Sequence, residues 1–215
     1  MLKIYGRKSS FNVQKVMWLV GEMRLPHRHV ELGGQFGGLD TNEFRALNPH
    51  GKVPVVDDNG IVVWESHAIL RYLADRYGHG LFWNSDPAER SLPDRWMDWA
   101  QTTLQPDFLN GVFWGFYRTP EERRDLRSVN RKVDLCSQHF MLLDRHLEDR
   151  AFMLGDALTL ADIPIGTHLY RYFNLDIERP SVLNVEAWYA RLQERAAYRE
   201  HVMIPFQELY GRLDY

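Results

Sequence analysis

The first part of the chain alternates between short apolar runs and amphipathic segments. Apolar residues from Val13 to Val20 recur at helical spacing, which predicts a helix over 12–23 with Gln14 and Lys15 on its polar face. Asn59-Gly60 is a strong hairpin-turn signal. The other elements expected in this part are strands over 2–5, 28–32, 53–57 and 61–64 and helices over 41–47 and 66–77. The order βαβαββα predicts an α/β domain with a mixed sheet that closes in an antiparallel hairpin.

The rest of the chain shows helical patterning only. Turn-forming residues between Gly78 and Pro87 predict a linker, placed at 81–87, between a domain over 1–80 and an all-helical domain over 88–215. Helices are expected over 88–116 with interruptions at Pro93 and Pro106, and over 120–148, 160–173, 184–195 and 201–213.

One helix start in the second part has its own signal. Thr159 and Asp162 have the spacing of a capping box, in which an acidic side chain reaches back to the residue that begins the helix. The acid here is aspartate, which is shorter than the usual glutamate. The pair predicts a structural cap rather than a site of chemistry.

Composition narrows the class of protein. Hydrophobic residues make up 45% of the chain and aromatic residues 13%, enough for a real core. A net charge of −3 gives no electrostatic reason to expect binding to nucleic acid or to an anionic membrane. The single cysteine, Cys136, excludes an intramolecular disulfide and fits a reducing compartment. With no signal-peptide pattern at Met1 and no long apolar run, a cytoplasmic location is expected.

Two short motifs suggest a peptide-binding site. Asn48 to Val56 reads as a turn that leads into a strand, and Pro54 must lie where no ladder hydrogen bond is needed. A cis Val53-Pro54 bond would turn the backbone of Val53 outward, where it can pair with an extended peptide. Glu65-Ser66 precedes an apolar helical run, and a hydroxyl with free amides at a helix start suits a carboxylate.

With these motifs, residues 1–80 resemble the thioredoxin-like domain of the cytosolic glutathione transferases, and the rest resembles that family's helical domain. The resemblance covers essentially the whole chain and rests on Val53-Pro54, Glu65-Ser66 and their order and spacing. It implies a homodimeric, serine-type, bacterial-like detoxification transferase. Such an enzyme converts glutathione into its thiolate and conjugates it to a small hydrophobic electrophile.

The residue that activates the thiol is expected in the loop before the first helix. By its distance from that helix, Ser10 takes the place of the family's serine, with Asn12 and then Ser9 as alternatives. A free thiol has a pKa of about 8.5, so a hydroxyl donor that favours the thiolate raises its concentration at neutral pH. Either serine can instead cap the helix, as serines often do.

The family pattern assigns the remaining contacts with glutathione. Val53, beside Pro54, pairs with the cysteinyl unit through its backbone, while Glu65 and Ser66 hold the γ-glutamyl end. Lys52 and His50 are candidates for the glycyl carboxylate, although a lysine in a loop is often only solvated.

The electrophile pocket is expected to be apolar. Its candidate walls are Phe11, Phe36, Phe113, Trp114 and Tyr117, with Phe108, Phe116, Phe206 and Tyr210 as further members of the aromatic set. Aromatic residues on helices are more often core than pocket. Asp98 is a candidate to reach the ligand's ammonium across a dimer interface, or is a plain solvated side chain.

Other chemistry has little support in the sequence. The nine histidines show no metal-ligand spacing, so neither a metal nor a cofactor is expected, and glutathione is a co-substrate. Two alternatives on the same fold remain open. One is a glutathione-dependent reductase or isomerase, which the absence of cysteine from the Ser9-Ser10-Phe11 loop disfavours. The other is a non-catalytic binding or scaffold protein.

Overall fold

The computed structural model describes residues 1–213 and divides them into two compact units. The first unit combines Met1–Asn84 with Ala197–Ile204, and the second combines Ser85–Ala196 with Pro205–Leu213. The main division falls within residues 81–87, where a linker was expected. No helix within residues 1–213 has both the length and the apolar composition that a membrane crossing requires.

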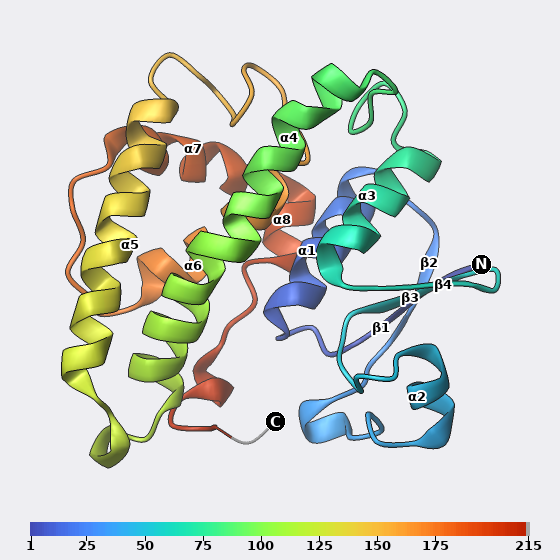
Figure 1. The fold of residues 1–215 in the computed structure, drawn as a ribbon, viewed down its shortest axis with the longest axis horizontal. Helices are drawn as coiled ribbons and strands as arrows, with labels where there is room; N and C mark the ends of the chain where they lie inside the picture. Colours follow the sequence, from blue (N-terminus) through green and yellow to red (C-terminus); the bar gives the residue numbers. More distant parts are fainter. Residues whose placement is uncertain (214–215) are drawn as a thin grey trace. The chain divides into compact units, whose positions relative to one another are not determined.

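A four-stranded mixed sheet forms the centre of the first unit (Figure 1). Its order is β2-β1-β3-β4, with β1 parallel to β2 and antiparallel to β3, and β3 antiparallel to β4. The strands are β1 (Leu2–Tyr5), β2 (His27–Val30), β3 (Val55–Asp58) and β4 (Ile61–Trp64). The predicted fold class is confirmed. The third strand begins two residues later than expected, because Val53 and Pro54 precede the ladder.

Two helices, α1 (Phe11–Glu22) and α3 (Ser66–Tyr77), pack against each other beside this sheet, and the short α2 (Asn42–Leu47) follows the single turn η1 (Gly34–Phe36). Residues 11 and 13–20 of α1 are all buried. The expectation that Gln14 and Lys15 lie on a polar face is wrong, since only 2% and 1% of their surfaces are exposed. α1 is enclosed on more sides than its modest amphipathic pattern indicates.

The segment Ala197–Ile204 belongs to the first unit although it follows the helical domain in sequence. Its helix α8 (Ala196–His201) packs on α1, where the rings of Trp18 and Tyr198 meet edge to face at 4.8 Å. The expected helix over 201–213 is wrong: α8 ends at His201, and only the turn η5 (Gln207–Leu209) follows. Pro205 limits helical continuation there.

The second unit is helical, and its longest helix packs along η3, the segment that continues the path of α4 (Figure 1). Its helices are α4 (Pro87–Trp99), α5 (Leu126–His146), α6 (Asp162–Asn174) and α7 (Leu183–Gln193). The chain after α4 stays helical with wider π-type turns through η2 (Ala100–Leu104) and η3 (Pro106–Arg118), and η4 (Glu121–Arg123) precedes α5. The expected interruptions at Pro93 and Pro106 are therefore wrong, because each proline removes one hydrogen bond without ending the helical path.

The start of α6 is built around a fully buried carboxylate. Asp162 accepts hydrogen bonds from the Thr159 N–H at 2.8 Å, the Thr159 hydroxyl at 2.9 Å and the Met153 N–H at 2.8 Å. Burial raises the pKa of this carboxyl to about 6, and the hydrogen-bond donors around it oppose the rise. The reach of Asp162 back to the Thr159 N–H confirms one half of the predicted capping box. The other half is wrong: the Thr159 hydroxyl donates to the same carboxylate, and Ala161 is the N-cap residue of α6.

Candidate functional site

The strand register brings three predicted site segments to one end of the sheet. Tyr5 at the end of β1 lies opposite Val55 at the start of β3, and Val55 lies opposite Trp64 at the end of β4. The loop after β1, the segment before β3 and the start of α3 therefore share this end. They contain Ser9, Ser10 and Asn12, then Val53 and Pro54, then Glu65 and Ser66.

The middle segment presents its backbone as predicted. The Val53-Pro54 peptide bond is cis, and Val53 forms no backbone hydrogen bond with another of residues 1–213. Gly6 lies against it, since a Cβ at Gly6 would stand only 2.9 Å from the Val53 Cβ. Gly6 also has a φ of 141°, which glycine adopts readily. The close approach joins the loop after β1 to the Val53 segment.

The start of α1 leaves polar groups available. Ser10 is the N-cap residue by its backbone, and its C=O accepts the Gln14 N–H at 2.9 Å, yet its side chain forms no capping bond. The alternative in which the Ser10 hydroxyl caps α1 is thus wrong. Asn12, one residue into α1, has a buried Oδ1 with no hydrogen-bond partner among the described residues. Ser9 is 9% exposed, so it is less accessible than Ser10.

The start of α3 has an unusual backbone. Glu65 is its N-cap residue with a φ of 69°, a conformation that costs an L-residue about 1–3 kcal/mol, and its exposed side chain forms no capping bond. Ser66 follows and is 5% exposed. The first N–H groups of a helix lack partners inside it and favour an anion through the helix dipole. A hydroxyl and amides at this point fit a carboxylate, with Glu65 alongside for an ammonium group.

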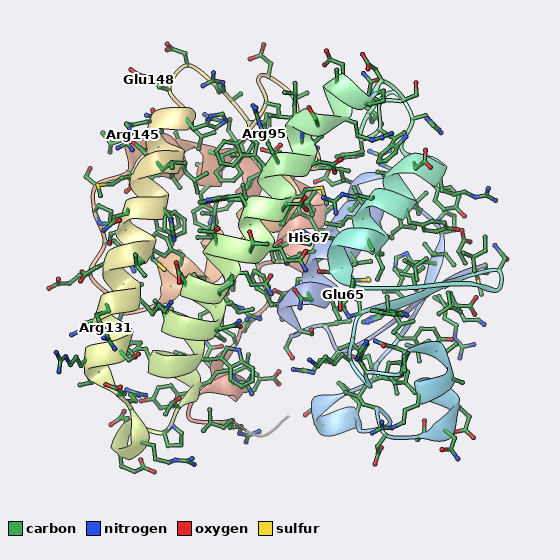
Figure 2. All side chains as sticks on the ribbon, in the orientation of Figure 1. Glu65, His67, Arg95, Arg131, Arg145 and Glu148 are labelled. Carbon is green, nitrogen blue, oxygen red and sulfur yellow. The ribbon has the colours of Figure 1, made fainter. Side chains whose placement is uncertain are left out.

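Two buried side chains behind this helix start were not predicted as part of the site. The Lys15 Nζ on α1 lies 3.2 Å from the His67 Nε2 on α3, and both side chains are buried. Figure 2 shows Glu65 and His67 at the same end of α3. Burial lowers the pKa of Lys15 to about 7, while the charge of Glu65 opposes that change. Lysine is rarely fully buried, so no sequence pattern indicated this placement.

The two candidates for the glycyl carboxylate lie in the exposed turn before Val53. Asn48 shapes this turn: its amide donates to the Lys52 C=O at 2.8 Å, and its Oδ1 accepts the His50 N–H at 3.1 Å. The His50 ring meets the Trp64 ring edge to face at 5.1 Å. Lys52 and His50 are both exposed, so each is accessible to a ligand.

The proposed apolar walls differ in exposure. In the first unit Phe36 is 43% exposed, whereas Phe11 is 4% exposed with the Lys15 ammonium 5.0 Å above its ring. In the second unit Phe113 is fully buried and stacks on Tyr117 with ring centroids 5.3 Å apart. Phe206 closes this cluster against both rings, and Trp114 lies under the Arg118 guanidinium. Phe108 is core, packed on His168 and Tyr172.

Within residues 1–213, no group of three or more histidine, cysteine or acidic side chains is arranged to hold a metal ion. Cys136 is buried in α5, and burial raises the pKa of its thiol to about 12. A thiol in that state is a poor nucleophile at neutral pH. An enzyme-bound mixed disulfide through this cysteine is therefore disfavoured.

Comparisons with known proteins match both parts of the chain. The family described as "Glutathione S-transferase, N-terminal domain" matches residues 4–83. Glutathione S-transferase GstB of Escherichia coli K12 is 38% identical over 207 residues, which cover 95% of this chain and 99% of that protein. This chain belongs to the cytosolic glutathione S-transferase family. Glutathione S-transferase hmp2 of Hypomyces subiculosus is 28% identical over 211 residues, which cover 92% of this chain and 96% of that protein.

Solved structures agree with this membership. The theta class glutathione S-transferase of Xanthomonas axonopodis pv. citri, solved with glutathione bound, is 41% identical. It superposes with a TM-score of 0.89 over 95% of this chain and 98% of that one. Glutathione transferase BmGSTD1 of Bombyx mori is 26% identical, with a TM-score of 0.83 over 97% and 95% of the two chains. The family's fold thus extends over both units.

Proposed function

We propose that this protein is a serine-type glutathione transferase that binds glutathione at the sheet end defined above. The register that unites Ser10, Val53 and Glu65-Ser66 is the observation that carries the proposal. Each segment leaves polar groups of the required kind open: a hydroxyl, a strand-like backbone and a helix N-terminus.

Each part of glutathione has a partner in this proposal. The Val53 backbone pairs with the cysteinyl unit, as an added strand would. The α3 amides and the Ser66 hydroxyl hold the γ-glutamyl carboxylate, and the Glu65 carboxylate holds its ammonium. Lys52 and His50 hold the glycyl carboxylate. The thiol is thereby directed to the start of α1.

Ser10 lowers the thiol pKa by donating its hydroxyl hydrogen to the thiolate, aided by the positive end of α1. The absence of a capping bond supports this role, because the hydroxyl oxygen accepts no helix N–H and the group is free to turn toward the sulfur. Asn12 is the second candidate, since a side-chain amide whose oxygen has no partner can also turn its N–H toward the sulfur. The thiolate then attacks the electrophilic carbon of a small hydrophobic substrate and displaces its leaving group.

The finer features of the function are part of the same proposal. In the first unit the exposed Phe36 is a candidate contact for the electrophile, and in the second unit Trp114 and Tyr117 are candidates. Phe11 and Phe113 are buried and support these residues from within their own units. The protein acts as a cytoplasmic homodimer in detoxification, with Asp98 as a candidate contact across the dimer.

The deciding experiment compares the wild type with Ser10→Ala. Glutathione binding is measured by calorimetry, and the pKa of the bound thiol by the ultraviolet absorbance of the thiolate. We expect Ser10→Ala to raise the bound thiol pKa by about 1–2 units and to lower kcat/KM with a nitroaryl chloride about 100-fold, with similar glutathione affinity.

Ser9→Ala and Asn12→Ala are the matched controls, because they alter the same loop and the same helix start. If Asn12→Ala raises the thiol pKa while Ser10→Ala does not, the thiol contact belongs to Asn12. If the wild type binds no glutathione, the enzymatic proposal fails and the non-catalytic alternative gains support.

A further inference from the structure

A cavity of about 360 Å³ lies within the first unit between α1, β2 and α8. Its lining includes three imidazoles, His27, His29 and His201, and two cations, Lys8 and Arg24. None of these residues has a part in the proposed transferase chemistry. The volume is within the range of about 300–1,000 Å³ that is common for small-molecule sites.

The fold gathers these imidazoles from distant parts of the chain. His27 and His29 are alternate residues of β2, so they lie on the same face of the sheet, while the intervening Arg28 points to the other face. His201 arrives on α8, and Gly21 of α1 makes room for it. A Cβ at Gly21 would stand 2.9 Å from the Ala197 Cβ and 3.0 Å from the His201 ring.

Two of the imidazoles have one nitrogen fixed on a backbone carbonyl. The His27 Nδ1–H donates to the Leu25 C=O at 2.9 Å, and the His29 Nε2–H donates to the Gly6 C=O at 2.6 Å. In the neutral ring the other nitrogen carries no hydrogen. Protonation therefore adds a new donor at that nitrogen, in each case on a ring that lines the cavity.

Positive charge in the cavity is only weakly compensated. Lys8 and Arg24 form no ion pair with any of the described residues. The one carboxylate in the lining, Glu200, has a side chain that is 74% exposed and lies 3.9 Å from the His201 Nε2. Burial lowers the pKa of His201; Glu200 opposes this, and His27, His29 and Lys8 lower it further. A negative charge bound in the cavity would instead raise the pKa of His201.

The rest of the lining is apolar. Met17 and Val20 of α1 are buried, and Leu25 and Ile204 contribute further aliphatic surface. Basic groups beside an aliphatic surface match a ligand with one anionic end and an apolar body.

We propose that this cavity binds a small organic anion, a carboxylate or sulfonate on an apolar body, and that binding takes up a proton at the imidazoles. The groups that set this pH dependence are Lys8 in the loop after β1, Arg24 after α1, His27 and His29 on β2, and Glu200 and His201 on α8. The proposal does not depend on the transferase function.

The test uses naphthalene-2-sulfonate, whose sulfonate stays ionised across the pH range, with the full-length protein in a calorimeter. We expect one molecule to bind, with affinity rising at least about three-fold from about pH 7.5 to about pH 5.5, as proton uptake requires. Titrations in two buffers that differ in ionisation enthalpy should report net proton uptake. The neutral analogue naphthalen-2-ylmethanol should bind at least about ten-fold more weakly, because it lacks the charge.

Arg24→Gln and Arg28→Gln form a matched pair, since both remove one exposed arginine within five positions and only Arg24 lines the cavity. We expect about a ten-fold loss of affinity in Arg24→Gln and no change in Arg28→Gln. His201→Gln should reduce the pH dependence, and its thermal unfolding shows whether it folds. If it does not, the arginine pair still decides.

Saturating S-hexylglutathione, which fills the glutathione site and places an apolar chain in the electrophile pocket, separates this cavity from the transferase site. Probe binding that persists with S-hexylglutathione bound supports the proposal, and displacement of the probe overturns it. The proposal also fails if no binding occurs at about pH 5.5, or if both arginine variants lose affinity equally. None of these outcomes decides the transferase proposal, which rests on Ser10.

Discussion

Polar side chains at three helix starts differ in whether hydrogen bonds within the protein satisfy them. One of these starts, at α6, lies in the second unit, and the other two, at α1 and α3, lie in the first. At α6, the Asp162 carboxylate is fully buried and accepts three hydrogen bonds from its own chain. At α1, the Ser10 hydroxyl forms no capping bond, and at α3, Glu65 has a positive φ and no capping bond.

This difference distinguishes polar groups that stabilise the fold from polar groups that can bind a ligand. A buried polar group that is fully satisfied stabilises the fold and leaves nothing for a ligand. Polar groups that gather at one sheet end without a local role are available for binding, and their conformational strain is maintained by the surrounding fold. Substitutions at the α6 start should therefore lower stability, whereas substitutions at the starts of α1 and α3 should lower ligand binding or activation with little loss of stability.

The largest effect on stability is expected at α6. Asp162→Ala removes the acceptor of three buried hydrogen bonds, and we expect it to lower the free energy of unfolding by about 4 kcal/mol. Denaturant unfolding measures the change. Asp156→Ala, at an exposed acid nearby, is the control and should change stability by less than about 0.5 kcal/mol. Equal losses in the two variants would contradict a special role for the α6 start.

The second-largest expected effect is a dependence of the unfolding free energy on pH, caused by the buried Lys15 behind α3. The pKa of Lys15 is lowered to about 7 in the folded state from an unfolded value of 10.5, so the unfolded chain binds more protons between those values. Stability should therefore rise as pH increases from about 7 to about 9, by up to about 2–3 kcal/mol from this group.

Lys15→Met removes the titrating amine while keeping an unbranched side chain. Subtracting its unfolding free energies from those of the wild type isolates the contribution of Lys15 and of groups coupled to it, including His67. A difference that stays flat from about pH 7 to about pH 9 would show that the lysine keeps its ordinary pKa despite burial.

A smaller effect is expected on ligand affinity at α3. Ser66→Ala should weaken glutathione binding about ten-fold, because a hydroxyl that donates to a carboxylate is lost. Its unfolding free energy should change by less than about 1 kcal/mol. Calorimetry measures the affinity, and Ser91→Ala in α4 serves as the remote control. Unchanged affinity in Ser66→Ala would remove Ser66 from the proposed site.

The smallest expected effect is a difference in stability between substitutions at two N-cap residues. The Thr41 hydroxyl accepts the Phe44 N–H at 3.2 Å at the start of α2, so Thr41→Ala should lower stability by about 1 kcal/mol. Ser10→Ala should lower it by less than about 0.5 kcal/mol, because no capping bond is lost. Thermal unfolding of the two variants gives the comparison. A larger loss for Ser10→Ala than for Thr41→Ala would return Ser10 to a structural role.

The candidate site was partly predictable from the sequence. Val53-Pro54 and Glu65-Ser66 could be found because proline and a polar helix start leave strong local signals. Lys15 and His67 could not, since their burial depends on how α1 and α3 pack, and a lysine in an amphipathic helix is ordinarily solvated. The role of Ser10 also needed the fold, because a serine before a helix has the same sequence signal whether or not it caps.

Local sequence signals were enough to predict the order of strands and helices, the hairpin at Asn59-Gly60, the contact of Asp162 with Thr159 and the resemblance to a family. These depend on local propensities and on spacing along the chain. Three features emerge only when the chain is folded: α8 returns to the first unit against Gly21, three histidines from β2 and α8 line one cavity, and Lys15 is buried beside His67. Each of these depends on contacts between residues far apart in sequence, whose geometry is fixed by packing rather than by any local pattern.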